Sequence, residues 1–385
     1  MDSRLRTQQL IVRLAIAFAC LGEASRAAAE PYLMVRQGAK CNDCHTNETG
    51  GGKRTAFAHI HAGEILHDLD LLPIPAGVKP FNGDINQYIS IGSDLRVSNI
   101  TTFQDKPNAA GRVPENKAFR RHVESNETSV NEFLVYSEVT LWPDVLSLYV
   151  DEDFNGGANN REAFALIRGF LPWQTYVKAG RFFPTYGLRV WDDQSFIRSQ
   201  TGFTFDNFDE GGEIGIAPGP FFLATSVTNG NPTFGSDVAA TVNGYGVFED
   251  VPVVRTVMAG ASYARLSPQR NEACVYAGSN LWNFTYLGEF DIIDDSTHLP
   301  PNTPRPQFVS YAELNLLLFD WLNLTGTFDF LKASQNSNQT RYTIGAQPFI
   351  NHFLQPIIEY QINNAPGTSV SLNQDVLWFE LHLFF

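Results

Sequence analysis

The stretch "LNLTGTFDF", residues 322–330, alternates between two kinds of side chain along its whole length. One face carries small or apolar residues: Leu322, Leu324, Gly326, Phe328 and Phe330. The other face carries polar residues: Asn323, Thr325, Thr327 and Asp329. The C-terminal stretch "LWFELHLFF", residues 377–385, repeats the pattern, with every second residue from Leu377 to Phe385 apolar. A period of two predicts β-strands that have one face in an apolar environment.

The rest of the chain from Phe81 to Phe385 shows the same alternation, more weakly. It contains no run of 18 apolar residues, so no transmembrane helix is expected there. Instead, runs of about ten residues with weak alternation are separated by turn residues, which is typical of a transmembrane β-barrel. The apolar faces are then expected to meet lipid and the polar faces a lumen. A soluble β-sandwich, whose core also alternates, is the competing interpretation.

The connections between these runs alternate in length, which favours the barrel. Short turns are expected around Pro143-Asp144, Pro172-Trp173, Pro218-Gly219, Asp250-Val251, Ser279-Asn280, Asp320 and Phe349-Asn351. Longer loops are expected near 105–127, 154–161, 184–210, 230–236, 267–272, 294–306, 334–338 and 364–373. Bacterial barrels place short turns in the periplasm and long loops outside. The sequence therefore predicts an all-β, outer-membrane barrel of about sixteen antiparallel strands.

The N-terminus has the form of a signal peptide. Arg4, Arg6 and Arg13 precede the apolar run 14–21, and small residues at 27–29 offer a cleavage site. Residues 1–29 are therefore predicted to direct export. The formal net charge of −14 argues against a nucleic-acid partner and favours surfaces that attract cations.

The segment "CNDCHT", residues 41–46, contains the C-x-x-C-H pattern of a covalent haem c. In that reading Cys41 and Cys44 form thioethers with one haem, and His45 is the proximal iron ligand. A disulfide between the two cysteines, or half of a zinc site, is the alternative. The sequence has no second C-x-x-C to complete a zinc site.

A distal iron ligand is sought in "AFAHIHAGEILH", residues 56–67, which supplies His59, His61 and His67. Each of them, taken singly, is also explained as a solvated or lumen-lining residue. His59 and His61 fit best, because a turn at Gly50–Gly52 lets the chain double back. On the lumen face of the last strand, His382 is a remote alternative.

Residues 30–80 form the predicted haem segment and residues 81–385 the predicted barrel. Fifty residues bury too little surface to build a full cytochrome fold. A sixteen-stranded barrel has a lumen that is wide enough for a plug. We therefore expect the haem segment to enter from the periplasmic end and to lie within or against the lumen.

Two acidic stretches are candidates for concentrating metal cations near the mouth of the barrel. They comprise Asp206, Asp209, Glu210 and Glu213 in "DNFDEGGE", and Asp291, Asp294 and Asp295 in "DIIDD". Carboxylates suit hard cations, including iron. Ordinary solvated loop charges, or calcium sites linked to lipopolysaccharide, are the alternative. Cys274 is the remaining cysteine, and no chemistry is assigned to it.

The stretch "VRQGAKCNDCHT", residues 35–46, resembles the haem site of the fused outer-membrane monohaem cytochrome c–porins of iron-oxidising bacteria. The resemblance implies a sixteen-stranded barrel with one haem c held by Cys41, Cys44 and His45. In that family the haem accepts electrons from ferrous iron and passes them to periplasmic cytochromes. The continuation "TNETGGGKRTAF", residues 46–57, is similar to related haem–barrel proteins of unassigned role.

The resulting hypothesis is one-electron transfer across the outer membrane, within lipid and lipopolysaccharide. Electrons would move between extracellular iron, or another extracellular redox partner, and a periplasmic c-type cytochrome. An Fe(II) oxidase-type reaction is one form of it. The alternatives are a passive porin with a haem-bearing plug, a haem peroxidase, and a barrel that hosts a separate cytochrome.

Overall fold

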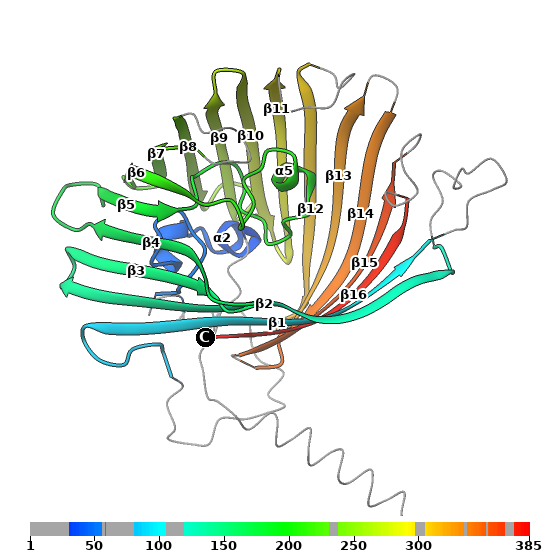
Figure 1. The fold of residues 1–385 in the computed structure, drawn as a ribbon, viewed down its shortest axis with the longest axis horizontal. Coiled ribbons are helices and arrows are strands. Elements are labelled where there is room, and N and C mark those ends of the chain that lie inside the picture. Colours follow the sequence, from blue (N-terminus) through cyan, green and yellow to red (C-terminus); the bar gives the residue numbers. More distant parts are fainter. Residues whose placement is uncertain are drawn as a thin grey trace, which may run out of the picture.

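The computed structural model describes residues 31–55, 58, 81–104, 119–230, 238–296, 305–334, 337–351, 353–365 and 373–385. Within these residues, sixteen strands form one closed barrel in which each strand pairs with its neighbours in chain order (Figure 1). The strands are β1 Ile89–Phe103, β2 Val123–Trp142, β3 Leu146–Asp153, β4 Asn159–Ile167, β5 Tyr176–Phe182, β6 Asp209–Ile216, β7 Phe221–Thr228, β8 Ala239–Glu249, β9 Thr256–Ser267, β10 Arg270–Leu281, β11 Phe284–Asp295, β12 Gln307–Phe319, β13 Leu322–Ser334, β14 Ser337–Pro348, β15 Leu354–Asn364 and β16 Asp375–Phe384. The helices are α2 Pro31–Gln37, α3 Cys41–Cys44 and α5 Phe196–Ser199.

The barrel closes through an antiparallel pairing of the first and last strands. Asn99 of β1 lies opposite Phe379 of β16, and Thr101 lies opposite Leu377. A closed barrel satisfies its backbone hydrogen bonds between strands and leaves no open edge, as a membrane interior requires. The predicted all-β class and the count of sixteen strands are both confirmed.

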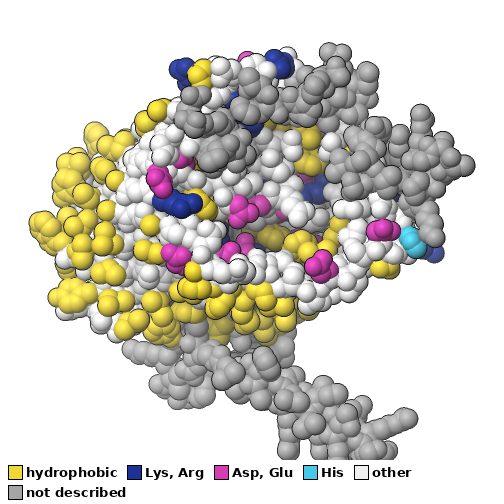
Figure 2. Space-filling model, in the orientation of Figure 1, with side chains coloured by type: hydrophobic (Ala, Val, Ile, Leu, Met, Phe, Trp, Pro, Cys, Tyr) yellow, Lys and Arg dark blue, Asp and Glu magenta, His cyan; other side chains and the backbone are white. Residues whose placement is uncertain are grey.

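The predicted faces of the strands are also confirmed. On β13, Asn323 and Asp329 are buried in the lumen. On β16, Glu380 and His382 are buried, whereas the alternate residues Leu377, Phe379, Leu381 and Leu383 are exposed on the outside. Figure 2 shows apolar side chains gathered around the outer surface, with acidic and basic side chains inside the opening. This is the surface of a barrel that crosses lipid.

Three of the predicted connections were wrong. The turn expected at Ser279-Asn280 follows β10 instead, between Leu281 and Phe284. The long loops expected near 267–272 and 334–338 are tight connections: β10 begins at Arg270, three residues after the end of β9, and β14 likewise begins three residues after the end of β13. The polar residues that suggested a loop belong to strands, because a polar lumen accepts charged side chains. Arg270, for example, forms a 3.0 Å ion pair with Asp295.

Two predictions fall outside the described residues: the signal peptide 1–29, and the distal-ligand candidates His59, His61 and His67. Among the residues that are described, no helix is long and apolar enough to cross a membrane.

Two segments lie inside the ring of strands (Figure 1). The first is the N-terminal segment 31–55 with α2 and α3, which we call the plug. The second is the connection between β5 and β6, residues 183–208 with α5, which we call the inward loop. The inward loop reaches the opposite wall, where the backbone N–H of Phe196 donates to Asp329 of β13 over 2.9 Å. Both segments bring functional groups into the lumen.

Candidate functional site

The plug docks at the end of the barrel that carries the short turns. Lys40 Nζ donates to the carbonyl oxygens of Ala217 and Gly219, at 3.2 and 3.1 Å, in the turn between β6 and β7. Arg36 donates to the carbonyl oxygen of Asn283, at 3.4 Å, in the turn between β10 and β11. The predicted placement of this segment, in the lumen at the short-turn end, agrees with these contacts.

Helix α2 fits against the barrel wall through a glycine. Tyr32 and Val35 are buried on its inner side. A Cβ on Gly278 of β10 would lie 2.8 Å from a methyl group of Val35. The absence of a side chain at Gly278 therefore allows the helix to pack directly on the strand.

After α3 the chain forms a hairpin that turns at three glycines. The hydrogen bonds Thr46 N to Lys53 O, 2.9 Å, and Thr55 N to Cys44 O, 3.0 Å, join its two arms. Residues 50–52 are all glycines with positive φ, +90°, +79° and +66°, a region that glycine occupies without strain. The predicted doubling back at Gly50–Gly52 is confirmed.

Buried polar contacts fix this hairpin to the barrel wall. Glu138 of β2 accepts hydrogen bonds from Thr46, at 3.1 Å, and from Lys53, at 3.2 Å. Lys178 of β5 donates to the side chain of Asn47 over 3.0 Å. Because both partners are removed from water in each contact, the hairpin has a defined position in the lumen.

Cys41, Cys44 and His45 follow one another through α3 and its C-terminal end. Both cysteines are half-buried free thiols, and burial raises the pKa of Cys44 to about 11. His45 is buried, and burial together with Arg54 and Arg189 lowers its pKa to about 3. The imidazole is therefore neutral, which is the form that binds a metal ion. Its Nδ1 atom has no hydrogen-bond partner among the described residues.

His45 lines an open cavity between the plug and the barrel wall. Its lining includes four aromatic residues, Tyr136, Phe183, Trp191 and Phe205, and four arginines, Arg54, Arg96, Arg161 and Arg189. Within the part of the chain that is described, the Nε atoms of Arg54 and Arg161 are buried without a hydrogen-bond partner. The cavity thus offers aromatic and charged walls, an imidazole nitrogen without a hydrogen-bond partner, and the buried guanidinium of Arg54. Arg161 forms an ion pair with Asp151, 4.0 Å, in the same lining.

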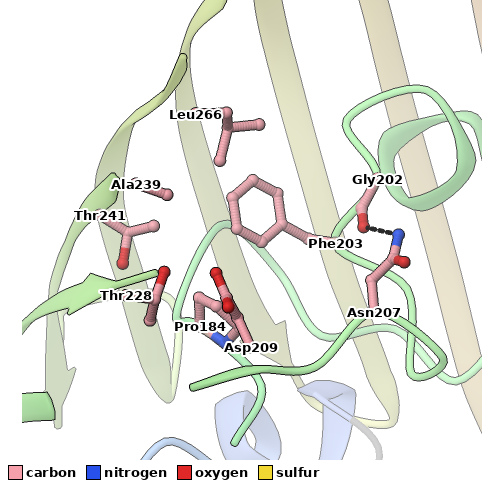
Figure 3. Close-up of a pocket in the computed structure, with 9 residues that line it drawn as sticks. All are labelled: Pro184, Gly202, Phe203, Asn207, Asp209, Thr228, Ala239, Thr241 and Leu266. Carbon is pink, nitrogen blue, oxygen red and sulfur yellow. Dashed lines mark hydrogen bonds between the residues drawn. The ribbon is translucent and has the colours of Figure 1, made fainter. Parts of the chain in front are cut away.

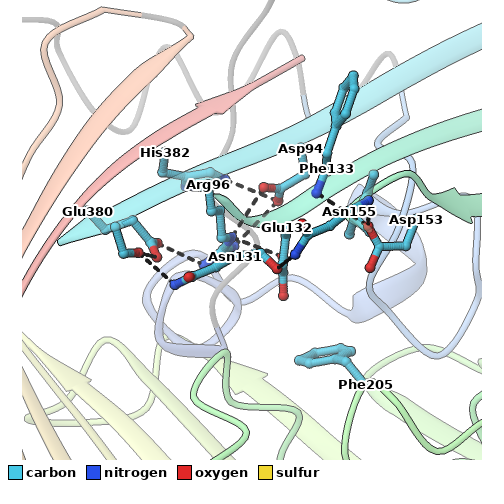
Figure 4. A network of polar contacts seen from close by, with 12 residues as sticks. Asp94, Arg96, Asn131, Glu132, Phe133, Asp153, Asn155, Phe205, Glu380 and His382 are labelled. Atoms are coloured by element: carbon cyan, nitrogen blue, oxygen red, sulfur yellow. Dashed lines mark hydrogen bonds and ion pairs between the residues drawn. The ribbon is translucent and has the colours of Figure 1, made fainter. Parts of the chain in front are cut away.

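One wall of the cavity is a network of charged groups (Figure 4). Arg96 forms ion pairs with Asp94, 3.1 Å, Glu132, 3.2 Å, and Glu380, 3.4 Å. His382 also lines the cavity, as its predicted lumen position requires. Its ring nitrogens are both hydrogen-bonded, Nε2 to Asp94 and Nδ1 to Gln355, each at 3.1 Å. His382 would have to give up one of these bonds to bind iron.

These residues fit a covalent haem. The attachment cysteines and the histidine are adjacent, and the histidine is neutral. The guanidinium of Arg54 suits a haem carboxylate, because a guanidinium pairs with a carboxylate in a fixed planar geometry. Arg161 could serve the second carboxylate in competition with Asp151, its ion-pair partner at 4.0 Å. Sequence reasoning missed the arginines, because they come together from the plug and β4 through the tertiary fold.

The two acidic stretches do not form the predicted cluster in loops at the mouth. Asp209 and Glu213 belong to β6, and Asp291 and Asp295 belong to β11; all four are buried in the lumen. Glu213 is paired with Lys178 at 2.8 Å. The prediction failed because lumen-facing strand residues look like loop residues in sequence.

Comparison with known proteins identifies the fold. Neither the known protein families nor the curated proteins contain a match to this chain. Among solved structures, OmpT of Vibrio cholerae is similar with a TM-score of 0.54 and 10% identity, over 77% of this chain and 97% of that one. The outer-membrane channel DcaP of Acinetobacter baumannii has a TM-score of 0.53 and 10% identity, over 77% and 97%. OprB of Pseudomonas putida has a TM-score of 0.52 and 11% identity, over 77% and 93%.

The likeness covers 77% of the chain, and the outer apolar surface described above is the one that such a barrel presents to lipid. The chain is therefore an all-β, sixteen-stranded barrel of the porin type, located in a bacterial outer membrane.

Proposed function

We propose that this protein carries one covalent c-type haem in the lumen of its barrel and transfers electrons across the outer membrane. The observation that carries the proposal is the position of His45: the histidine of the C-x-x-C-H motif lines a lumen cavity that also contains unpartnered arginine nitrogens. A bound haem would supply one-electron exchange between Fe(II) and Fe(III).

The residues of the chain have separate tasks in this proposal. Cys41 and Cys44 would hold the cofactor, and His45 would ligate its iron. Arg54 would pair with a carboxylate of the cofactor, and Arg161 could do so only in competition with Asp151. The aromatic residues of the cavity would cover part of its apolar surface. The partners are extracellular iron, or another extracellular redox partner, and a periplasmic c-type cytochrome. An Fe(II) oxidase-type reaction is the specific form that we propose for iron.

A passive porin with a haem-bearing plug is the second candidate, and the likeness to outer-membrane channels favours it. The position of the plug and the inward loop in the lumen counts against it. The buried contacts of the plug with β2 and β5, and those of the inward loop with β13, occupy space that solutes would need.

Proteoliposomes distinguish the two functions. The haem-loaded protein is reconstituted in vesicles that enclose oxidised soluble cytochrome c, and ferrous iron is added outside. If the protein transfers electrons, the enclosed cytochrome is reduced at a rate that depends on the amount of protein. The variant in which both attachment cysteines are replaced by serine should then leave the enclosed cytochrome largely oxidised. A passive porin predicts large open channels in planar bilayers and entry of small solutes into the vesicles. Turnover of peroxide by the loaded protein would point to a peroxidase instead.

A further inference from the structure

A second cluster of potential ligands lies in the lumen wall beneath the inward loop. It comprises Cys274 of β10 with Glu289 and Asp291 of β11, and all three are buried. Cys274 lies directly opposite Asp291 in the strand register, and Glu289 is two residues along the same face. One ligand atom from each residue lies within 4.8 Å of the others.

The inward loop closes over this cluster. The hydroxyl of Tyr186 donates to one carboxylate oxygen of Asp291 over 3.1 Å, and the backbone N–H of Leu188 donates to Glu289. Gly187, between them, has a φ of +53°, and a Cβ there would collide with the Glu289 carboxylate. Elsewhere on the same loop, Phe203 lines a small pocket together with strand residues such as Leu266 (Figure 3). The loop is thus fitted closely to the wall.

Asp291 is not fully satisfied by these contacts. Its second carboxylate oxygen, Oδ2, is buried and has no hydrogen-bond partner among the described residues, although the side chain is 0% exposed. Several other buried carboxylates of the lumen have a cation at hand: Glu272 and Asp295 pair with Arg270, and Glu213 pairs with Lys178. Among the described residues, no Lys or Arg forms an ion pair with Glu289 or Asp291. A buried carboxylate without a counter-charge is costly.

We propose that Cys274, Glu289 and Asp291 bind a divalent transition-metal ion of the Zn²⁺ type. Calcium and magnesium take oxygen ligands, whereas a thiolate with two carboxylates selects a softer cation. Three protein ligands leave a fourth position for water, as in zinc sites that keep an open position. Binding releases the thiol proton to solvent, and the metal supplies the positive charge that the cluster lacks. Ligand shifts on the order of 1 Å bring the three atoms to bonding distance.

The test uses purified, folded full-length protein without a histidine tag, in the Cys41→Ser/Cys44→Ser background. That background removes the other thiols of the described residues and makes the result independent of the proposed haem. The protein is treated with a chelator, dialysed against Zn²⁺, and examined by elemental analysis and zinc X-ray absorption spectroscopy. We expect one bound zinc per chain, with one sulfur neighbour at about 2.3 Å.

The nearly isosteric variant Cys274→Ser is expected to lose the sulfur neighbour and to bind zinc at least 10-fold more weakly. Asp291→Asn is expected to weaken binding to a similar extent while retaining the sulfur. Glu313→Gln is the matched control: Glu313 is a buried lumen carboxylate of β12 that bonds to Tyr311 and Asn315, outside the cluster. Folding of each variant is checked by heat-modifiable migration. Absence of stoichiometric zinc in the background protein, or an unchanged metal environment in folded Cys274→Ser, would overturn the proposal.

Discussion

Replacing Gly52 with alanine should loosen the plug without disturbing the barrel. Gly52 has a φ of +66°, and a Cβ at this position would collide with the hydroxyl of Tyr149. That hydroxyl accepts the 3.0 Å hydrogen bond from the backbone N–H of Lys53 that fixes the hairpin to β3. The substitution therefore acts on the hairpin twice, through its backbone and through its contact with the wall.

The two effects have known sizes. A left-handed conformation costs a residue with a Cβ about 1–2 kcal/mol. Loss of a buried hydrogen bond costs about 1–3 kcal/mol. Docking of the hairpin should then weaken by about 2–5 kcal/mol, which is roughly a 30-fold to a few thousand-fold change in the ratio of docked to undocked plug.

The assay is single-channel conductance in planar bilayers, combined with limited proteolysis of the plug in detergent. Gly52→Ala should open more often and expose the plug to protease, while the barrel keeps its heat-modifiable migration. Gly156→Ala is the matched control, since Gly156 has a φ of +78° but nothing within 4 Å of an added Cβ. If Gly52→Ala behaves like Gly156→Ala in both assays, the docking geometry described here is wrong.

Two further substitutions test the barrel itself. Lys178→Met leaves Glu213, its buried partner at 2.8 Å, without a counter-charge. Thermal unfolding in detergent should show that the free energy of unfolding falls by about 3–5 kcal/mol. The double variant with Glu213→Gln should recover part of this stability, and a fall of under about 1 kcal/mol in the single variant would contradict the pairing. Ile344→Arg places a charge on the outer face near the middle of β14, where Ile344 is 62% exposed. In lipid this should lower the free energy of unfolding by about 2–4 kcal/mol. Phe221→Arg, at the end of β7, should lower it by only about 0–1 kcal/mol. Equal costs measured by urea unfolding in vesicles would argue that this face does not meet lipid.

The barrel could be predicted from the sequence because its physical cause is local. Alternation such as that of residues 322–330 reports directly on which side chains face lipid and which face the lumen. Strand boundaries were less predictable at Arg270 and Ser337, since charged and polar residues are tolerated on a lumen face and resemble a loop. The count of strands survived these errors, because each misplaced connection still joined the same two strands.

The lumen was predictable only in part. The C-x-x-C-H motif and the turn at Gly50–Gly52 are visible in the sequence. The arginines of the cavity and the pairing of Cys274 with Asp291 depend on register and on the path of the inward loop. Strand register and loop path leave no periodic signal in the sequence. For this reason no function could be assigned to Cys274 from the sequence, before its neighbour Asp291 on β11 was known.

The most direct test of haem attachment at Cys41 and Cys44 is the covalent haem content of the protein, produced in a host with cytochrome c maturation. We expect one haem per chain that stays attached through denaturation, with absorbance lost when Cys41 and Cys44 are both replaced by serine. Cys274→Ser should retain the full haem content, which separates attachment from a general effect of cysteine loss. A folded, membrane-inserted barrel that leaves the same host without haem absorbance would contradict the account.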